Sequence, residues 1–336
     1  MRRVFTSISA GLIVFTTAAI AAAQVLTTQG GRFAIDGQPG FLVFVSYFDA
    51  LRRIPESLDS SVLDADLDYF AASGVSGIRV FPNWHVRNET LIDGSGNLRP
   101  VQLRKLEVLI GRAAAKRLVV DLSLTHDTVP GLTPPDYLRG VQATAAALRG
   151  RTNVLFDLQN ELDHHVPAAD ARHPEQWTLH EWRAFVGNEI KTAVKQADPS
   201  RLVTVSWTSD RSPSELVANL RDGGYDVLAY HHRRESWVAD SSAYVKTFES
   251  LLEAARLERP IYFQEPARRG LAGVPAAESD FLAALTGARD AGAAAWTLHV
   301  PAPDLSGTTP FRDLVSNTER AVLSKLRAAL SGRGGR

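Results

Sequence analysis

Two glutamates follow apolar runs at the points where polar loops begin. Residues 154–159 form one run and lead into Asn160 and Glu161, while residues 261–264 form the other and lead into Glu265. A short apolar run bounded by polar residues predicts a buried strand, so each glutamate is expected where a strand ends. Two carboxyl groups on either side of a glycosidic bond can cleave it by acid–base and nucleophilic catalysis. The spacing therefore indicates carboxylate chemistry on a sugar.

Eight apolar runs along the chain provide the strands that would position these groups. The runs are mostly continuous rather than alternating, which is typical of parallel strands covered on both faces. Stretches with apolar residues three and four apart separate the runs and predict helices. Eight strand–helix units in 336 residues predict an α/β fold, a single-domain (β/α)8 TIM barrel rather than an open doubly wound sheet. The runs span residues 41–48, 77–81, 118–125, 154–159, 202–207, 227–231, 261–264 and 293–298. The helical stretches span residues 62–70, 103–113, 138–148, 182–194, 216–220, 244–257, 281–288 and 314–330.

The two ends of the chain depart from this pattern. Residues 1–23 combine two arginines, an apolar run and small residues in the order of a secretory signal peptide. We expect this segment to be removed, which would leave a secreted or periplasmic protein without a membrane anchor. Residues 24–330 are expected to form the catalytic domain, beginning with a short hairpin around the Asp-Gly turn at 36–37. Residues 331–336 are expected to be a disordered tail.

The composition narrows the classes of partner and chemistry. The 37 basic and 37 acidic residues balance, so nothing favours nucleic acid or an anionic membrane as a partner, and a neutral substrate is expected. The chain has no cysteine, which excludes disulfides, thiol catalysis and thiolate zinc sites. It also lacks the Gly-x-Ser-x-Gly elbow, the P-loop and the Gly-rich dinucleotide fingerprint. We therefore expect a monomeric enzyme that works without a cofactor.

In a (β/α)8 barrel, the active site lies at the C-terminal ends of the strands and in the loops that follow them. That rule selects polar and aromatic residues after several of the predicted strands. Besides the two glutamates, they are Tyr47, Arg79, Trp84, His126, Asn160, Tyr230, His231, His232 and Trp296. Further tryptophans at residues 177, 207 and 237 are candidates for stacking on sugar rings.

The order of these residues resembles that in the retaining glycoside hydrolases of clan A, most closely the cellulase-like family 5. The family carries Asn-Glu after strand four, Glu after strand seven, Arg on strand two, a His or aromatic pair on strand six and Trp on strand eight. The matching positions here are Asn160 with Glu161, Glu265, Arg79, Tyr230 with His231, and Trp296. The family's strand six has Tyr two residues after its His, whereas Arg233 occupies that place here. Tyr230 and His232 are the alternatives for supporting the nucleophile.

The resemblance implies a double displacement. Glu161 would be the acid/base, protonated in the resting enzyme, and Glu265 the ionised nucleophile. Arg79 would lower the pKa of Glu265, Asn160 would bind the sugar 2-hydroxyl, and Trp296 would lie beneath the ring. The predicted function is an exported, retaining glycoside hydrolase that cleaves O-glycosidic bonds of a neutral, β-linked oligo- or polysaccharide. No metal is expected in this mechanism.

Two other functions fit the same residues. One is a non-catalytic barrel that binds carbohydrate through its carboxylates. The other is a metal-dependent barrel hydrolase with His126, Glu161, His231 and Glu265 as ligands. A loop at residues 163–176 holds several Asp and His residues, but it lacks the spacing of a helical zinc site and is interpreted as a cleft wall.

Overall fold

The computed structural model describes residues 24–84, 89–168, 176–208, 210–232, 237–266, 277–300 and 307–332. The expected signal peptide at 1–23 and residues 333–336 of the expected tail lie outside the described residues. Within the described part of the chain, no helix is long and apolar enough to cross a membrane.

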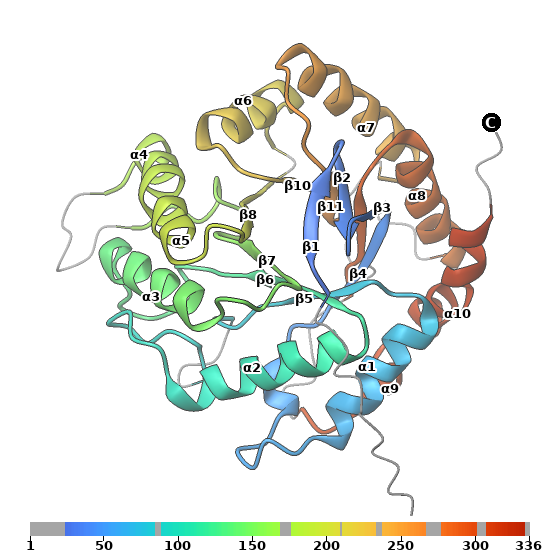
Figure 1. Ribbon diagram of the computed structural model, residues 1–336. Helices are drawn as coiled ribbons and strands as arrows, with labels where there is room; N and C mark the ends of the chain where they lie inside the picture. Colours follow the sequence, from blue (N-terminus) through green and yellow to red (C-terminus); the bar gives the residue numbers. More distant parts are fainter. Residues whose placement is uncertain are drawn as a thin grey trace, which may run out of the picture.

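Parallel strands form a barrel at the centre of the molecule, with helices around it (Figure 1). The sheet order is β8-β7-β6-β5-β4-β12-β11-β10-β9. The predicted fifth strand consists of two pieces separated by Val205, and one piece pairs with β7 while the other pairs with β10. The two pieces close the ring, so the predicted (β/α)8 barrel is confirmed. The strands are β4 (Leu42–Ser46), β5 (Gly77–Val80), β6 (Val119–Ser123), β7 (Val154–Asp157), β8 (Leu202–Thr204), β9 (Ser206–Trp207), β10 (Leu228–His231), β11 (Ile261–Glu265) and β12 (Ala295–Leu298).

Helices form the outer layer. The predicted last helix is two helices, because the backbone at Val315 is extended and Ser316 caps a new helix with Glu319 in a capping box. The predicted fourth helix contains a π-helical turn in its middle, at η2. The helices are η1 (Ala50–Arg53), α1 (Ser61–Ser73), α2 (Pro100–Ala115), α3 (Pro134–Ala147), α4 (Leu179–Ala184), η2 (Phe185–Ile190), α5 (Lys191–Ala197), α6 (Pro213–Gly223), α7 (Trp237–Ala254), α8 (Glu278–Ala291), α9 (Phe311–Leu314) and α10 (Asn317–Ser331).

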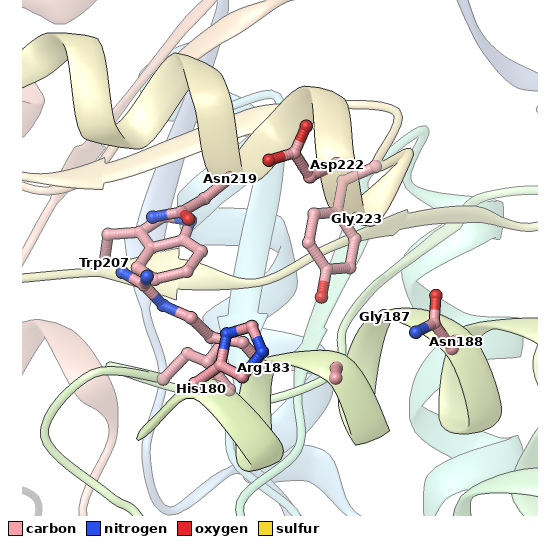
Figure 2. A pocket seen from close by; sticks show the side chains of 11 residues that line it. His180, Arg183, Gly187, Asn188, Trp207, Asn219, Asp222 and Gly223 are labelled. Carbon is pink, nitrogen blue, oxygen red and sulfur yellow. The ribbon is translucent and has the colours of Figure 1, made fainter. Parts of the chain in front are cut away.

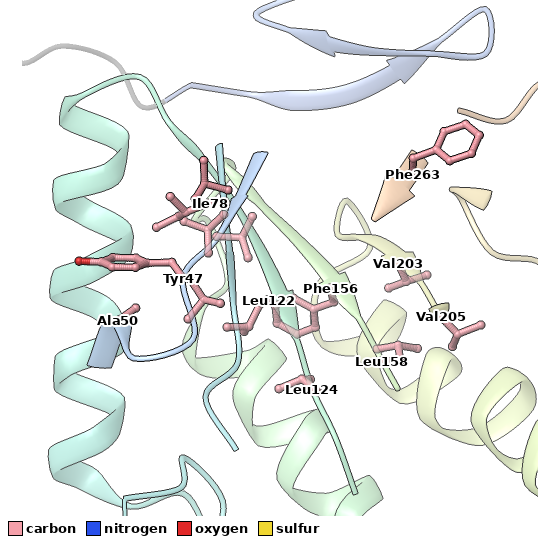
Figure 3. Packing of buried hydrophobic residues seen from close by; sticks show 14 of the residues in the cluster. Tyr47, Ala50, Ile78, Leu122, Leu124, Phe156, Leu158, Val203, Val205 and Phe263 are labelled. Atoms are coloured by element: carbon pink, nitrogen blue, oxygen red, sulfur yellow. The ribbon is translucent and has the colours of Figure 1, made fainter. Parts of the chain in front are cut away.

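The buried apolar residues form two clusters because side chains alternate between the faces of each strand. The larger cluster fills the layer between strands and helices, and Figure 3 shows part of it around Leu122, Leu124, Phe156 and Leu158. The smaller cluster joins residues of opposite strands, including Phe44, and therefore fills the N-terminal half of the barrel interior. The C-terminal half of the interior is left for polar groups.

The expected N-terminal hairpin is part of a three-stranded antiparallel sheet, β1 (Leu26–Gln29), β2 (Arg32–Ile35) and β3 (Gln38–Gly40). Leu26 and Phe33 of this sheet belong to the inner apolar cluster. Figure 1 shows the sheet lying across one end of the barrel. The sheet thus closes the end opposite the strand C-termini and shields the apolar N-terminal half of the barrel interior from water.

Candidate active site

The fold brings the two glutamates together although 104 residues separate them. Glu161 follows β7 and Glu265 ends β11, and each offers a carboxylate oxygen to a group that also contains a ring nitrogen of His231. These three atoms all lie within 4.8 Å of one another. Retaining glycosidases hold their carboxyl groups about 5–5.5 Å apart, whereas inverting enzymes need about 6.5–9.5 Å. One oxygen of Glu161 and one of Glu265 therefore lie closer together than the separation of an inverting enzyme, which favours the retaining arrangement.

Arg79 on β5 anchors one side of this group. Its guanidinium is fully buried and donates to Glu265 Oε1 at 2.5 Å, to Asn160 Oδ1 at 2.6 Å and to Ser123 Oγ at 2.8 Å. It also stacks over the ring of Phe81, with its central carbon 4.5 Å from the ring centroid. A planar guanidinium has a rigid fork of donors, so it fixes these three acceptor side chains in one orientation.

A layer of buried acids lies below Arg79 in the barrel. Asp157 Oδ2 is 3.3 Å from one guanidinium nitrogen, and Asp121 Oδ2 is 3.6 Å from another. Gln264 donates to both carboxylates, at 3.0 and 2.8 Å. Burial raises the pKa of Asp121 to about 7, because a single cation cannot compensate three carboxylates in this interior. Asp121 is therefore partly protonated near neutral pH.

Glu265 is held in its ionised form. Burial alone would raise its pKa, but the charges of His231, His299 and Arg79 outweigh burial and lower the pKa to about 2. His299 Nε2 lies 3.4 Å from Glu265 Oε2, and the other ring nitrogen is 2.7 Å from Ser46 Oγ. A carboxylate that is ionised at neutral pH and keeps a side-chain exposure of 9% at the end of β11 can act as a nucleophile.

Glu161 has different surroundings. Its backbone is left-handed, with φ of 47°, and its amide donates to Ser206 Oγ at 2.9 Å. Left-handed backbone at a residue other than glycine is costly, so it persists here only because the surrounding contacts hold it. The carboxylate lies 2.9 Å from His231 Nδ1 through Oε1 and 3.6 Å from His165 Nε2 through Oε2. The left-handed backbone and the two imidazoles together orient the carboxylate of Glu161.

The imidazoles change the expected protonation of Glu161. Burial raises its pKa, but the contacts and charges of His165 and His231 outweigh burial and hold the pKa well below its usual range. The resting carboxyl is thus ionised, in contrast to the protonated state expected from the sequence. The pKa of His165 is raised to about 10, first by its bond to Asp127 and then by Glu161.

The structure does not bring Trp296, Tyr230 or His232 to this group. Trp296 is fully buried in the outer apolar cluster, beneath α8. Tyr230 packs in the same layer against Tyr244 and Phe248 of α7, and the ring of His232 lies 5.1 Å from that of Tyr244. All three side chains point out of the barrel, because strand alternation places them on the opposite face from His231.

Tyr47 and His126 also lie outside the site. Tyr47 donates to Asp66 of α1 at 2.7 Å and packs on Phe70 in the helix layer. The ring of His126 lies 5.5 Å from each of the rings of Tyr137 and Trp182, which belong to α3 and α4. Neither residue is therefore placed to contact a sugar at the two glutamates.

Trp84 lies at the rim of the barrel mouth. It contacts the stacked rings of Phe48 and Phe81, and Phe48 in turn contacts the ring of His299. Trp84 is partly exposed, so this aromatic cluster presents a ring to solvent next to the groups that contact Glu265. Among the predicted aromatic residues whose side chains the structure describes, it is the one linked to the site, through Phe48 and His299.

Three residues beside the glutamates had no predicted role in the site, although His299 and Asp127 were recognised at strand ends. His299, which directly follows β12, lies where Trp296 had been expected, and His165 with Asp127 flanks Glu161. A signal for His299 was present, because Thr297 and His299 alternate with the apolar Trp296 and Leu298. Since one strand face is apolar and the other polar, the alternation indicated which side chains enter the barrel. No comparable periodicity exists in the loop that carries His165.

Glu161, His231 and Glu265 are also donors of the kind that bind divalent cations. His126, the fourth ligand of the metal hypothesis, faces the helix layer instead. Arg79 already occupies one oxygen of Glu265, and a fixed positive charge at that distance opposes a second cation. The chemistry of this donor set therefore fits a pair of acids better than a metal centre.

A cavity of about 290 Å³ lies outside the barrel, between α4, η2 and α6 (Figure 2). Its walls include Arg183, Trp207 and Asn219, and neither glutamate lines it. The guanidinium of Arg183 covers the ring of Trp207, with 5.0 Å between its central carbon and the ring centroid. Trp207 is therefore not available as a sugar platform at the barrel mouth. The side chain of Trp237 lies outside the described residues.

The fold is similar to those of several solved glycoside hydrolases. A structure of GH5_18 from Streptomyces cattleya in complex with GlcNAc matches with a TM-score of 0.59 and 19% identity, over 88% of this chain and 82% of that one. A β-mannanase from the blue mussel Mytilus edulis matches at 0.60 and 17%, over 90% and 96%. A β-1,4-D-mannanase from Cryptopygus antarcticus matches at 0.64 and 14%, over 93% and 96%. No protein-family model and no curated protein sequence matches the chain. The chain therefore has the (β/α)8 fold that these glycoside hydrolases share.

Proposed function

We propose that this protein is a retaining glycoside hydrolase of the family 5 type. The observation that carries the proposal is that one carboxylate oxygen of Glu161 and one of Glu265 lie within 4.8 Å of each other at the C-terminal mouth of the barrel. The different surroundings of the two acids support a division of labour. Glu265 is held ionised by Arg79 and two histidines, whereas Glu161 lies among imidazoles that can hold a proton beside it.

In the first step, a carboxylate oxygen of Glu265 attacks the anomeric carbon. The bond from that carbon to the leaving oxygen breaks, and Glu161 delivers a proton to the oxygen. Covalent attachment removes the negative charge of Glu265. In the second step, Glu161 takes a proton from water, the water oxygen attacks the anomeric carbon, and Glu265 leaves. Two inversions give a product of retained configuration.

Substrate contacts follow from the donors that remain at the site. Asn160 accepts from Arg79 through Oδ1, so its amide Nδ2 remains to donate to a sugar 2-hydroxyl. The rings of Trp84 and Phe48 offer apolar faces at the rim. A neutral, β-linked oligo- or polysaccharide suits these apolar faces, and mannans are the first candidates because structural neighbours are described as mannanases. We further propose that the enzyme is exported after loss of residues 1–23 and acts as a monomer.

The two acids can be told apart by azide rescue. With an aryl β-glycoside, Glu265→Ala should reduce turnover by roughly 10⁴-fold or more, and azide should yield the glycosyl azide of inverted configuration. Glu161→Ala should yield the azide of retained configuration from the same substrate, because azide then attacks the glycosyl-enzyme. Product stereochemistry is read by NMR. Glu258→Ala, at an exposed glutamate, is the matched control and should be unchanged.

Other outcomes identify the alternatives. Saturable binding of mannan oligosaccharides without hydrolysis, kept in a Glu161→Gln, Glu265→Gln double variant, would replace the enzyme by a binding protein. Loss of activity on exhaustive chelation, restored by a divalent cation, would establish the metal-dependent hydrolase instead. Equal activity of Glu265→Ala and the unsubstituted protein would remove Glu265 from the mechanism.

A further inference from the structure

We propose that His165 and Asp127 form a positioning pair that holds the proton of the acid/base Glu161 and takes it back in each turnover. The inference rests on the proposed function and deepens it by assigning the residues that control the protonation of this site. The pair is made by two loops, one following β6 and the other following β7.

The geometry is a chain of three side chains. Asp127 Oδ2 lies 2.7 Å from His165 Nδ1, and His165 Nε2 lies 3.6 Å from Glu161 Oε2. The first contact is a hydrogen bond that fixes the ring and directs Nε2 toward the glutamate. The second exceeds hydrogen-bond distance, and such contacts often tighten only when substrate is bound. Asp127 thus orients an imidazole toward the group that must exchange a proton.

Local backbone structure keeps the ring in place. The amides of His164 and His165 both donate to the carbonyl of Glu161, at 2.8 and 3.1 Å. This turn places residue 165 on the same side as the carboxylate four residues earlier. Asp163 braces the turn through bonds to Thr208, at 3.1 and 2.7 Å. The relation of His165 to Glu161 is therefore set by hydrogen bonds of the main chain.

His231 is less suited to the same task. It is almost fully buried and lies between the glutamates, 2.9 Å from Glu161 Oε1 and 3.7 Å from Glu265 Oε2. Loss of its proton would also remove a charge that keeps the nucleophile ionised. His165 contacts the acid/base and Asp127, and its side chain is 26% exposed. Solvent can therefore restore its proton without disturbing Glu265.

The charged groups around Glu161 determine which side chain carries the proton in the free enzyme. His165 faces it from its own loop, His231 from β10 and Glu265 from β11, while Asp127 contacts the other nitrogen of the His165 ring and lies in the field of His126. The pKa of His165 is raised and that of Glu161 lowered, so the imidazole carries the proton at neutral pH. The protonated ring of His165 can then transfer its Nε2 proton to Glu161.

The proton balance closes over one turnover. In the first step, the Nε2 proton of His165 passes to Glu161 and from Glu161 to the leaving oxygen, which becomes a hydroxyl, and His165 is left neutral. In the second step, Glu161 takes a proton from the attacking water and returns it to His165. Glu265 forms and then loses its bond to the anomeric carbon, and no other reactant is consumed.

Leaving-group dependence tests the pair, because a leaving group that needs no proton bypasses it. For His165→Gln, kcat/KM on a dinitrophenyl glycoside should stay within about 3-fold, whereas kcat/KM on a phenyl or alkyl glycoside should fall by roughly 10²- to 10³-fold. Asp127→Asn should show the same pattern with a smaller loss. His164→Gln, at an exposed neighbour in the same turn, is the matched control and should behave as the unsubstituted protein.

The pH profile gives a second readout with a defined sign. A raised pKa keeps the proton in place until the pH exceeds it, so removal of His165 should move the alkaline limb of kcat/KM to lower pH by at least about one unit. A loss that is equal for all leaving groups, with an unmoved alkaline limb, would show that the pair is only structural and overturn the inference. In that case Glu265→Ala would still be inactive, so the proposed function would stand. An unsubstituted protein that hydrolyses no glycoside would refute both.

Discussion

Residues of the same type have different surroundings on the two faces of the barrel strands, one facing the barrel interior and the other facing the helix layer. Inside the barrel mouth, His231 and His299 contact the carboxylate of Glu265, each through a ring nitrogen. On the outer face, His232 and Trp296 are as deeply buried, yet they pack among aromatic residues of the helix layer. His231 and His232 are adjacent in sequence and serve different parts of the molecule.

The difference teaches that position along a strand outweighs residue type. Side chains alternate with a period of two, so a shift of one residue exchanges the barrel interior for the helix layer. In the interior, polar side chains meet a buried guanidinium and carboxylates, and electrostatics dominates. In the outer layer, the same types contribute apolar area and ring contacts. The following predictions test this contrast.

The largest effect is expected at Arg79, which holds the interior together. Arg79→Met would leave Asp121, Asp157 and Glu265 without their shared cation, so we expect a loss of about 3–5 kcal/mol in the free energy of unfolding. Activity should also be lost, because the pKa of Glu265 would rise. Urea unfolding and aryl glycosidase assays measure the two effects.

Arg79→Lys serves as the comparison for that variant. It keeps the charge but not the fork that reaches Glu265, Asn160 and Ser123 together. We expect it to recover part of the stability and little of the activity. A Met variant as stable as the original protein would show that the buried acids take up protons at no cost and that the interior does not depend on its cation.

A smaller effect is expected from the two adjacent histidines. His231→Ala removes a charge that lies beside both glutamates, and kcat should fall by roughly 10²- to 10³-fold. His232→Ala should leave kcat within about 3-fold and lower the free energy of unfolding by about 1–3 kcal/mol through lost packing. Steady-state kinetics measures kcat of both variants, and thermal unfolding measures their stability. Equal losses of kcat would remove the contrast between the two faces.

The smallest kinetic effect is expected at the tryptophans. Trp296→Leu should cost about 2–4 kcal/mol of stability with KM unchanged, because the indole lies beneath α8. Trp84→Ala should do the reverse, with KM raised about tenfold and little change in stability, because its ring is at the rim. A raised KM in Trp296→Leu, with stability retained, would place that indole against substrate after all.

Much of the fold could be predicted because it depends on local periodicity. Runs of apolar residues marked the strands, and three- and four-residue spacing marked the helices, so the eightfold alternation followed. The break of the fifth strand at Val205 and the split before α10 could not be predicted. Helix caps and strand ends vary by a few residues without a change in composition. Of the site, the two glutamates and Arg79 were found by their place at strand ends.

The sequence by itself determined that a parallel barrel would form and that Glu161, Glu265 and Arg79 would lie near its mouth, because strand periodicity and chain order are local properties. Only the tertiary structure decided which neighbours share that mouth. The register of each strand, the left-handed turn at Glu161 and the meeting of the two loops that carry Asp127 and His165 depend on packing between distant segments. Protonation of the two acids follows from that packing, since the pKa of a buried carboxyl depends on the charges placed around it.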